Sequence, residues 1–253
     1  MSPYLFPPKA SYRIVQISDC HLLAGIDELY QGVRPGRYLQ QAVARIQQSA
    51  PDALLLTGDL SQDHSVQSYQ LLTELLQGLS CPIFLLPGNH DDRAMLAAVA
   101  EQAPCHSATA LQLGDWQLLL LDTKGPTPAG EFCQQRRQAL QSEFMRSRAG
   151  HFWLFCHHHP RPLGWSIDRH GLAEPELFWQ LLGEEPRVRG LAHGHCHYAY
   201  AAVHQHIQLV GCPASSVQFL ATADWQTVDQ GPQWCQWQFT EAGKVSWQFC
   251  KTG

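Results

Sequence analysis

The sequence predicts an α/β fold built around a largely parallel β-sheet. Short apolar runs, typical of buried strands, alternate along the chain with amphipathic segments, typical of helices, and this alternation favours a parallel sheet. Five of the strand-like runs lead directly into short motifs that contain aspartate, asparagine or histidine. Open α/β sheets bind ligands beyond the carboxyl ends of their strands, so the five motifs predict one shared site.

The first half of the chain contains three strand-like runs, each followed by a polar motif. The runs cover residues 12–18, 53–57 and 82–86, and the motifs are Asp19-Cys20-His21, Gly58-Asp59 and Pro87-Gly88-Asn89-His90-Asp91. Helices are predicted at residues 39–46 and 72–79, because apolar side chains recur there at helical spacing. A further helical pattern starts at Ala94 and Met95, for which Asp91 is a candidate N-cap.

The second half repeats this alternation and then changes to β-type sequence. Strands are predicted at residues 116–121, 152–156 and 188–192, with a helix at 134–144. The last two of these strands lead into His157-His158-His159-Pro160 and His193-Gly194-His195-Cys196-His197. From Tyr198 onward, segments at 207–210, 234–239 and 245–249 predict a second sheet packed against the first. No long linker or repeat interrupts the chain, so we expect residues 1–253 to form a single domain.

The composition narrows the classes of partner. The chain has 253 residues, 45% of them hydrophobic, which is enough for a substantial core. Its net charge of −5 disfavours extended nucleic acid as a partner, because a polymer needs many phosphate contacts. No segment has the length and apolarity of a membrane span or a signal peptide, so we expect a cytoplasmic protein. Its nine cysteines form no C-x-x-C pair and are expected to be reduced thiols.

The polar motifs indicate a metal site. Aspartate, asparagine and histidine together suit borderline to moderately hard divalent cations such as Mn, Fe, Zn or Co. Each motif alone has an ordinary interpretation, because Gly-Asp is a common turn signal and clustered histidines also occur on surfaces. Five such motifs at strand ends are harder to explain as five independent turns. We therefore expect them to share a metal centre.

The ordered motifs resemble those of the calcineurin-like metallophosphoesterases. The resemblance rests on Asp19-x-His21, Gly58-Asp59, Gly88-Asn89-His90-Asp91, His158-x-Pro160 and Gly194-His195-x-His197, which span residues 12 to 197. It implies a four-layer αββα sandwich of two mixed β-sheets flanked by helices. Residues 58–63, the three histidines before Pro160, residues 165–170 and residues 213–219 are similar to bacterial class III 3′,5′-cyclic-AMP phosphodiesterases. This similarity implies a small cyclic nucleotide as substrate.

The resemblance also implies a role for each motif residue. Two divalent metal ions, Fe, Mn or Zn, are expected. The residues implied to hold the first are Asp19, His21 and His197, those implied to hold the second are Asn89, His158 and His195, and the residue implied to bridge them is Asp59. Among the three adjacent histidines, His158 matches the family ligand two residues before Pro160, which leaves His157 and His159 as packing or supporting groups.

The implied reaction is hydrolysis of 3′,5′-cyclic AMP to 5′-AMP by a metal-bridging hydroxide. His90 is the implied acid and phosphate contact, and Asp91 is a candidate to orient the His90 imidazole, alongside its N-cap interpretation. The residues implied to contact the substrate are His21, Asp59, Asn89, His90 and His197. The candidates for contacts to the purine are Tyr30, Arg34, Trp165, His170 and Phe219, each of which is also an ordinary loop or core residue.

Two other functions stay open from the sequence. The same chemistry serves phosphoesterases that act on another phosphodiester, a nucleotide pyrophosphate or a phosphomonoester, and the metal motifs do not separate these substrates. A noncatalytic scaffold with this fold is disfavoured, because no implied ligand is missing and His90 is present. Cys20 and Cys196, in the middle of two ligand motifs, are expected to be packed and unreactive, and His193 is given no ligand role. No feature predicts an oligomeric state.

Overall fold

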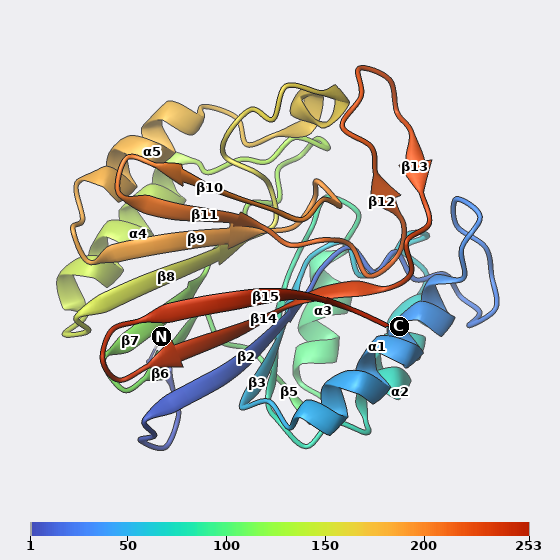
Figure 1. Ribbon diagram of the computed structural model, residues 1–253, viewed down its shortest axis with the longest axis horizontal. Coiled ribbons are helices and arrows are strands. Elements are labelled where there is room, and N and C mark those ends of the chain that lie inside the picture. Colours follow the sequence, from blue (N-terminus) through green and yellow to red (C-terminus); the bar gives the residue numbers. More distant parts are fainter. Residues whose placement is uncertain (1, 253) are drawn as a thin grey trace.

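Two β-sheets pack face to face in the computed structural model, which describes residues 2–252 (Figure 1). The strands of the six-stranded sheet are β2 (Ser11–Ile17), β3 (Ala53–Thr57), β4 (Ile83–Leu86), β5 (Cys105–His106), β14 (Gln233–Thr240) and β15 (Val245–Lys251). Their order is β15-β14-β2-β3-β4-β5. The sheet is mixed, because β2 to β5 run parallel whereas β14 pairs antiparallel with β2 and with β15.

The second sheet has seven strands in the order β1-β6-β7-β8-β9-β11-β10. Its strands are β1 (Tyr4–Leu5), β6 (Ala110–Leu113), β7 (Trp116–Leu120), β8 (His151–Cys156), β9 (Val188–His193), β10 (Tyr200–His204) and β11 (Ile207–Gly211). The central strands β7, β8, β9 and β11 are parallel. A separate antiparallel pair, β12 (Gln218–Phe219) and β13 (Thr227–Val228), stands beside the two sheets (Figure 1).

Helices cover the outer face of each sheet. The helices on the six-stranded sheet are α1 (Pro35–Ser49), α2 (Val66–Leu76) and α3 (Arg93–Ala100), and those on the seven-stranded sheet are α4 (Gln134–Arg146) and α5 (Pro175–Gly183). A short 3₁₀ helix, η1 (Ser166–His170), lies between β8 and α5 in the chain. The αββα sandwich of two mixed sheets that the sequence implied is therefore confirmed. None of the described helices has the length and apolarity of a membrane span.

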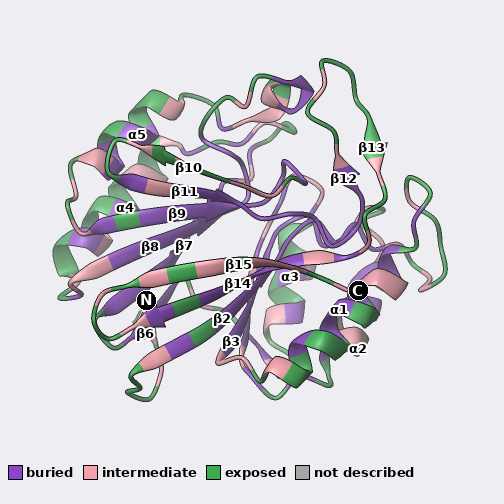
Figure 2. Ribbon diagram, in the orientation of Figure 1, coloured by how far each residue is buried: buried purple, intermediate pink, exposed green. Residues whose placement is uncertain are grey.

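The buried strands contribute apolar side chains to the layers on both faces of each sheet. In β3, Leu54 and Leu56 pack against the helices on the outer face, whereas Leu55 points into the layer between the sheets. Successive side chains of a strand point to opposite faces, so a strand covered on both sides needs an apolar residue at every position. The central strands are accordingly buried along most of their length (Figure 2).

The C-terminal strands differ from the sequence-based expectation. Segments after Tyr198 were expected to form the second sheet, but they are divided between both sheets. β10 and β11 extend the sheet that contains β9, whereas β14 and β15 complete the sheet that contains β2. The second sheet begins much earlier, at β1 and β6. Helix α5 was not predicted, and neither were the two-residue strands, which carry almost no periodic signal.

We predict that Trp237→Ala destabilises the fold by about 3–5 kcal/mol, the usual cost of truncating a large buried aromatic side chain. Trp237 is fully buried between the sheets, its ring centroid lies 5.2 Å from that of Trp153, and its Nε1 donates to Gln16 Oε1. Denaturant unfolding followed by circular dichroism measures the loss. Met145→Ala is the control, because Met145 is 79% exposed and should change stability by less than about 0.5 kcal/mol. A loss below about 1 kcal/mol for Trp237→Ala would contradict this account of the core.

Candidate metal centre

The carboxyl ends of β2, β3, β4, β8 and β9 meet at one edge of the sandwich, and the polar motifs follow them there. Backbone hydrogen bonds join neighbouring loops. Asp19 N donates to Gly58 O at 2.9 Å, and Gly194 N donates to His157 O at 3.1 Å. A side-chain bond crosses between the sheets, because His157 Nδ1 lies 2.8 Å from the carbonyl oxygen of Thr57. The site is therefore built by both sheets together.

An open cavity of about 610 Å³ lies over these loops. The motif residues that line it are His21, Asp59, Asn89, His90, His195 and His197. Asp19 and His157 lie next to this group and are fully buried. The cavity thus gives solvent and a small ligand access to a cluster of buried imidazoles and carboxylates.

One set of potential ligands is formed by Asp19, His21 and His197. One donor atom from each lies within 4.8 Å of the others. His197 Nε2 is 3.3 Å from Asp19 Oδ1 and 3.1 Å from His21 Nε2. The Asp19 carboxylate is held in place by the backbone N–H of His195, which lies 3.0 Å from Oδ2.

A second set surrounds His157. Its Nε2 lies 3.4 Å from Asp59 Oδ2, 3.2 Å from Asn89 Oδ1 and 3.2 Å from His195 Nδ1. Asp59 Oδ2 is also 3.7 Å from His21 Nε2, so this carboxylate faces both sets. One carboxylate between two groups of nitrogen and oxygen donors is the arrangement expected of a dinuclear centre.

The hydrogen bonds of His21 and His197 show that the first set fits a cation. His197 Nδ1 lies 2.6 Å from the Val217 carbonyl, and His21 Nδ1 lies 2.7 Å from Gln62 Oε1. Both acceptors require a proton on Nδ1, so in the neutral rings each Nε2 carries a bare lone pair. These lone pairs face each other at 3.1 Å, and burial lowers the pKa of His21 to about 4. A cation between the two atoms would turn this repulsion into coordination.

The hydrogen bonds favour His157 over His158 as a ligand. The Nδ1 of His157 donates to Thr57 O, so Nε2, which is directed at Asp59 and Asn89, is the nitrogen that a cation would bind in place of a proton. In His158 both ring nitrogens have other partners, since Nδ1 contacts Thr123 Oγ1 at 2.9 Å and Nε2 contacts Pro128 O at 3.2 Å. Counting residues back from Pro160 does not show which imidazole already has hydrogen-bond partners for both of its ring nitrogens.

The ligand loops hold an uncommon backbone conformation. Five candidate ligands have positive φ values and are not glycine: Asp19 (57°), His21 (48°), Asp59 (52°), His195 (66°) and His197 (49°). L-residues adopt this left-handed region rarely and at a cost of order 1–3 kcal/mol, and such strain concentrates at functional sites. The surrounding sandwich must therefore stabilise these loops.

The glycines of the motifs make room for the carboxylates. A Cβ atom at Gly88 would overlap Oδ1 and the backbone nitrogen of Asp59, and one at Gly194 would overlap the Ser18 hydroxyl. A side chain at either position would push Asp59 or the Asp19 loop away from the cluster. The sequence pattern Gly-Asn-His and Gly-His-x-His thus has a steric cause.

The two carboxylates stay ionised despite their burial. Burial alone would raise the pKa of Asp59, but the imidazole of His157 outweighs it and holds this pKa well below the usual range. In the same way His197 lowers the pKa of Asp19 against the effect of burial. Conversely, burial would lower the pKa of His157, but Asp59 raises it to about 9. The site therefore keeps negative charge where a cation would bind.

His90 faces the cavity beside both sets. Its backbone N–H donates to Asp59 Oδ1 at 2.8 Å, and its ring packs edge-on against His21 with centroids 5.2 Å apart. The ring of His64, which the sequence did not indicate, stacks on His90 with centroids 6.3 Å apart. Burial lowers the pKa of His90, so its protonated form is a stronger acid than free imidazolium.

Asp91 has a different role from either one expected. Its carboxylate accepts hydrogen bonds from the backbone N–H groups of Leu60, Ser61 and Gly88, at 3.0, 3.2 and 2.8 Å. It ties the loops after β3 and β4 together and does not orient the His90 imidazole. The N-cap of α3 is the next residue, Asp92, which accepts from the first turn of the helix. The sequence could not distinguish orientation of His90 from capping of the helix, because an aspartate just before a helix fits both roles.

Three of the five candidates for purine contacts line the cavity: Tyr30, His170 and Phe219. Tyr30 stacks on His21 and Phe219 stacks on His197, with ring centroids 4.8 and 3.9 Å apart. Trp165 is buried against Cys196 instead, and Arg34 is the N-cap of α1, outside the cavity lining. Trp225 also lines the cavity and was missed, since its loop has no recognisable motif.

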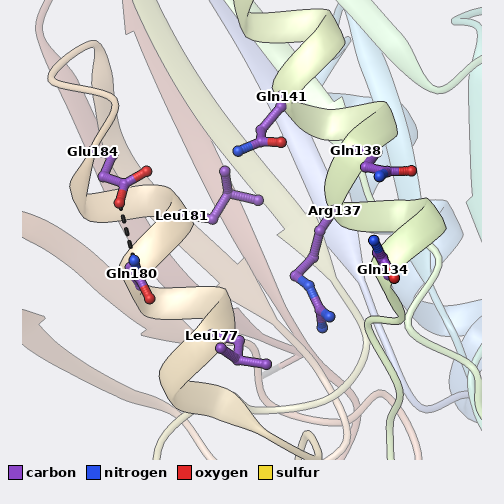
Figure 3. A pocket seen from close by; sticks show the side chains of 8 residues that line it. All are labelled: Gln134, Arg137, Gln138, Gln141, Leu177, Gln180, Leu181 and Glu184. Carbon is purple, nitrogen blue, oxygen red and sulfur yellow. Dashed lines mark hydrogen bonds between the residues drawn. The ribbon is translucent and has the colours of Figure 1, made fainter.

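A second pocket lies on the surface between α4 and α5 (Figure 3). Its polar lining consists mainly of glutamine side chains with Arg137 and Glu184, and Gln180 Nε2 donates to Glu184 Oε1 at 3.2 Å. None of the groups of potential metal ligands found among residues 2–252 lies in its lining, which distinguishes it from the cavity at the strand ends.

The sequence of this chain is similar to those of known phosphoesterases. Residues 12–199 match the model of the family described as calcineurin-like phosphoesterase. The chain is 36% identical over 226 residues to a probable cyclic nucleotide phosphodiesterase of Pseudoalteromonas sp. (strain SM9913), covering 88% of this chain and 86% of that one. It is 32% identical over 232 residues to the 3′,5′-cyclic adenosine monophosphate phosphodiesterase CpdA of Escherichia coli (strain K12), covering 89% and 84%.

Solved structures share the fold at much lower identity. A dimetal phosphatase from Danio rerio superposes with a TM-score of 0.67 at 12% identity, over 96% of this chain and 99% of that chain. A purple acid phosphatase from yellow lupin superposes with a TM-score of 0.71 at 13% identity, over 99% of this chain and 53% of that one. These likenesses support the αββα architecture.

Cys20 and Cys196 are completely buried next to the ligands. Burial raises the pKa of each thiol to about 12, so the reactive thiolate is scarce at neutral pH. We predict that iodoacetamide leaves both unlabelled in the native protein, while the partly exposed Cys133 is labelled. Peptide mass spectrometry reads out each site, and the denatured chain should label at all nine cysteines. Labelling of Cys20 as fast as Cys133 in the native protein would show that this packing is wrong.

Proposed function

Because the chain belongs to the calcineurin-like phosphoesterase family, we propose that it hydrolyses 3′,5′-cyclic AMP to 5′-AMP at the candidate metal centre. The observation that carries the proposal is the position of Asp59, whose Oδ2 faces both sets of donors. The named activity of relatives that cover most of the chain supports the substrate.

We propose two divalent cations, each held by one set of donors. Asp19, His21 and His197 would hold one, and Asn89, His157 and His195 would hold the other. Asp59 would bridge them. His157 replaces His158 in this assignment, because Nε2 of His157 is directed at Asp59, whereas both ring nitrogens of His158 contact other groups. The mixture of carboxylate, amide and imidazole donors suits Mn, Fe or Zn.

When bound, the two cations would supply Lewis acidity, which stabilises charge on the phosphoryl oxygens and lowers the pKa of water. The residues proposed to surround the phosphate are His21, Asp59, Asn89, His90 and His197, all of which line the cavity. The water oxygen bonds to phosphorus and gives up one proton to solvent as the P–O3′ bond breaks, and His90 gives a proton to the departing 3′ oxygen. General acid catalysis of this kind contributes about 10²–10⁴-fold.

Charge around the site suits a small anion. The chain carries a net charge of −5, but two dications bring +4 to the point where the phosphate would bind. This attraction is local, so it serves a mononucleotide better than a polymer that needs phosphate contacts along its length. The proposed partner is therefore a free cyclic nucleotide.

We also propose that residues 1–253 act as one domain in the cytoplasm. The last two strands complete the sheet that contains β2, so the C-terminal region is part of the sandwich. Seven of the nine cysteines are buried as free thiols, the state that a reducing compartment maintains.

The assignment of His157 predicts different behaviour for two neighbouring substitutions. His157→Ala should lose at least half of the bound metal and slow cyclic AMP hydrolysis at least about 100-fold, as Asp59→Ala should, because a direct ligand is removed. His158→Ala should keep most of its metal, since it removes contacts only to Thr123 and Pro128. Elemental analysis of protein purified without chelators measures occupancy, and thermal unfolding controls for folding. Metal loss in His158→Ala with full occupancy in His157→Ala would instead support His158 as the ligand, as the family resemblance implied.

A substrate panel tests the proposed activity. With Mn or Fe supplied, we expect the highest kcat/KM for 3′,5′-cyclic AMP or cyclic GMP, and lower values for 2′,3′-cyclic AMP, bis(p-nitrophenyl) phosphate and p-nitrophenyl phosphate. Asp59→Ala is the matched inactive control. Equal or greater activity on the last three compounds would favour a phosphoesterase of another specificity and reject the cyclic nucleotide assignment.

A further inference from the structure

The cavity over the metal centre continues outward to a group of aromatic side chains. Its lining includes the candidate ligands, most of them buried, as well as three less buried aromatic residues, Phe219, Trp225 and His170. These three residues come from β12, from the loop between β12 and β13, and from η1. The aromatic group is therefore assembled from separate segments at the mouth of the same cavity.

The rings form a continuous path from a candidate ligand to the surface. Phe219 stacks on His197 with centroids 3.9 Å apart and planes 5° apart. Trp225 meets Phe219 edge-on at 5.4 Å, and His170 stacks on Trp225 at 5.9 Å. Trp225 therefore contacts Phe219, the ring that covers His197, and it is 45% exposed. His170 and Phe219 cover part of the indole, and its exposed part is open to a ligand.

The loop that carries Trp225 is held in place by hydrogen bonds. Leu220 N donates to Gln226 O at 2.9 Å, which closes the loop at the end of the β12–β13 pair. Ser166 N donates to Thr222 O at 3.1 Å and links the loop to η1. The indole and the His170 imidazole are therefore positioned relative to each other before any ligand arrives, which lowers the entropic cost of binding.

The distribution of charge around the cavity predicts how a nucleotide would be oriented in it. The described residues that line it include neither lysine nor arginine, so a phosphate has no side-chain cation at the mouth. The anionic end of a nucleotide belongs at the metal ligands. The uncharged end, a flat aromatic base, matches the indole, because bases stack on aromatic side chains with little dependence on sequence.

We propose that Trp225, supported by His170, binds the nucleobase of the substrate by stacking and so favours nucleoside cyclic phosphates over smaller diesters. This specificity role rests on the proposed function, because it assumes that a cyclic phosphate occupies the metal centre. It assigns the base to the β12–β13 loop rather than to Tyr30, which is less exposed than Trp225.

The test compares two substrates that differ only in the base: 3′,5′-cyclic AMP and 1-O-methylribose 3′,5′-cyclic phosphate. Trp225→Ala should raise KM for cyclic AMP roughly tenfold, within the 5- to 150-fold range expected for loss of one stacked base, with little change in kcat. KM for the abasic diester should stay the same. Trp225→Phe should retain most of the affinity, because an aromatic face remains.

Leu220→Ala is the matched control, because Leu220 lies in the same loop, is 37% exposed and does not line the cavity. It should leave both substrates unaffected. An equal rise in KM for the two substrates, or no rise in Trp225→Ala, would overturn the base-binding role while leaving the proposed function intact. Failure of the unsubstituted protein to hydrolyse cyclic AMP would overturn the proposed function and this inference together.

Discussion

The hydrogen bond from His157 Nδ1 to the Thr57 carbonyl is the interaction on which the metal centre depends. It joins the end of β3 in one sheet to the end of β8 in the other. It also orients the ring, so that Nε2 is directed at Asp59. The bond between His197 Nδ1 and Val217 O does the same for the first set of donors. Backbone carbonyls thus determine which imidazole nitrogens are available as ligands.

The sandwich provides the rigidity that such a site needs. Five ligand positions in the left-handed backbone region cost energy, and the loops that contain them are short. Their ends are fixed by strands buried on both faces, and Asp91 joins two of the loops through three backbone N–H groups. Burial raises the pKa of Asp91 to about 7, and the N–H groups of Gly88 and Ser61 oppose this rise. The ionised carboxylate and the two loops therefore stabilise each other.

Much of this arrangement could be predicted from the sequence, and the exceptions have physical causes. Strand ends that carry aspartate and histidine indicated where the site lies, because parallel strands share one edge. The choice among His157, His158 and His159 could not be predicted, since it depends on partners such as Thr57 and Thr123 that are distant in the sequence. Trp225 was missed for a similar reason: its importance comes from the approach of η1. The C-terminal strands were assigned to one sheet because periodicity shows that a strand exists but not which neighbour it pairs with.

The pairing of β14 with β2 has a consequence for folding. β2 leads directly into the loop with Asp19 and His21, yet its partner on one side is formed by residues 233–240. Contacts between segments this far apart in the sequence form slowly, because closing a long loop of chain costs entropy before the contact is made. The loop with Asp19 therefore gains part of its support only once two distant segments of the chain have met.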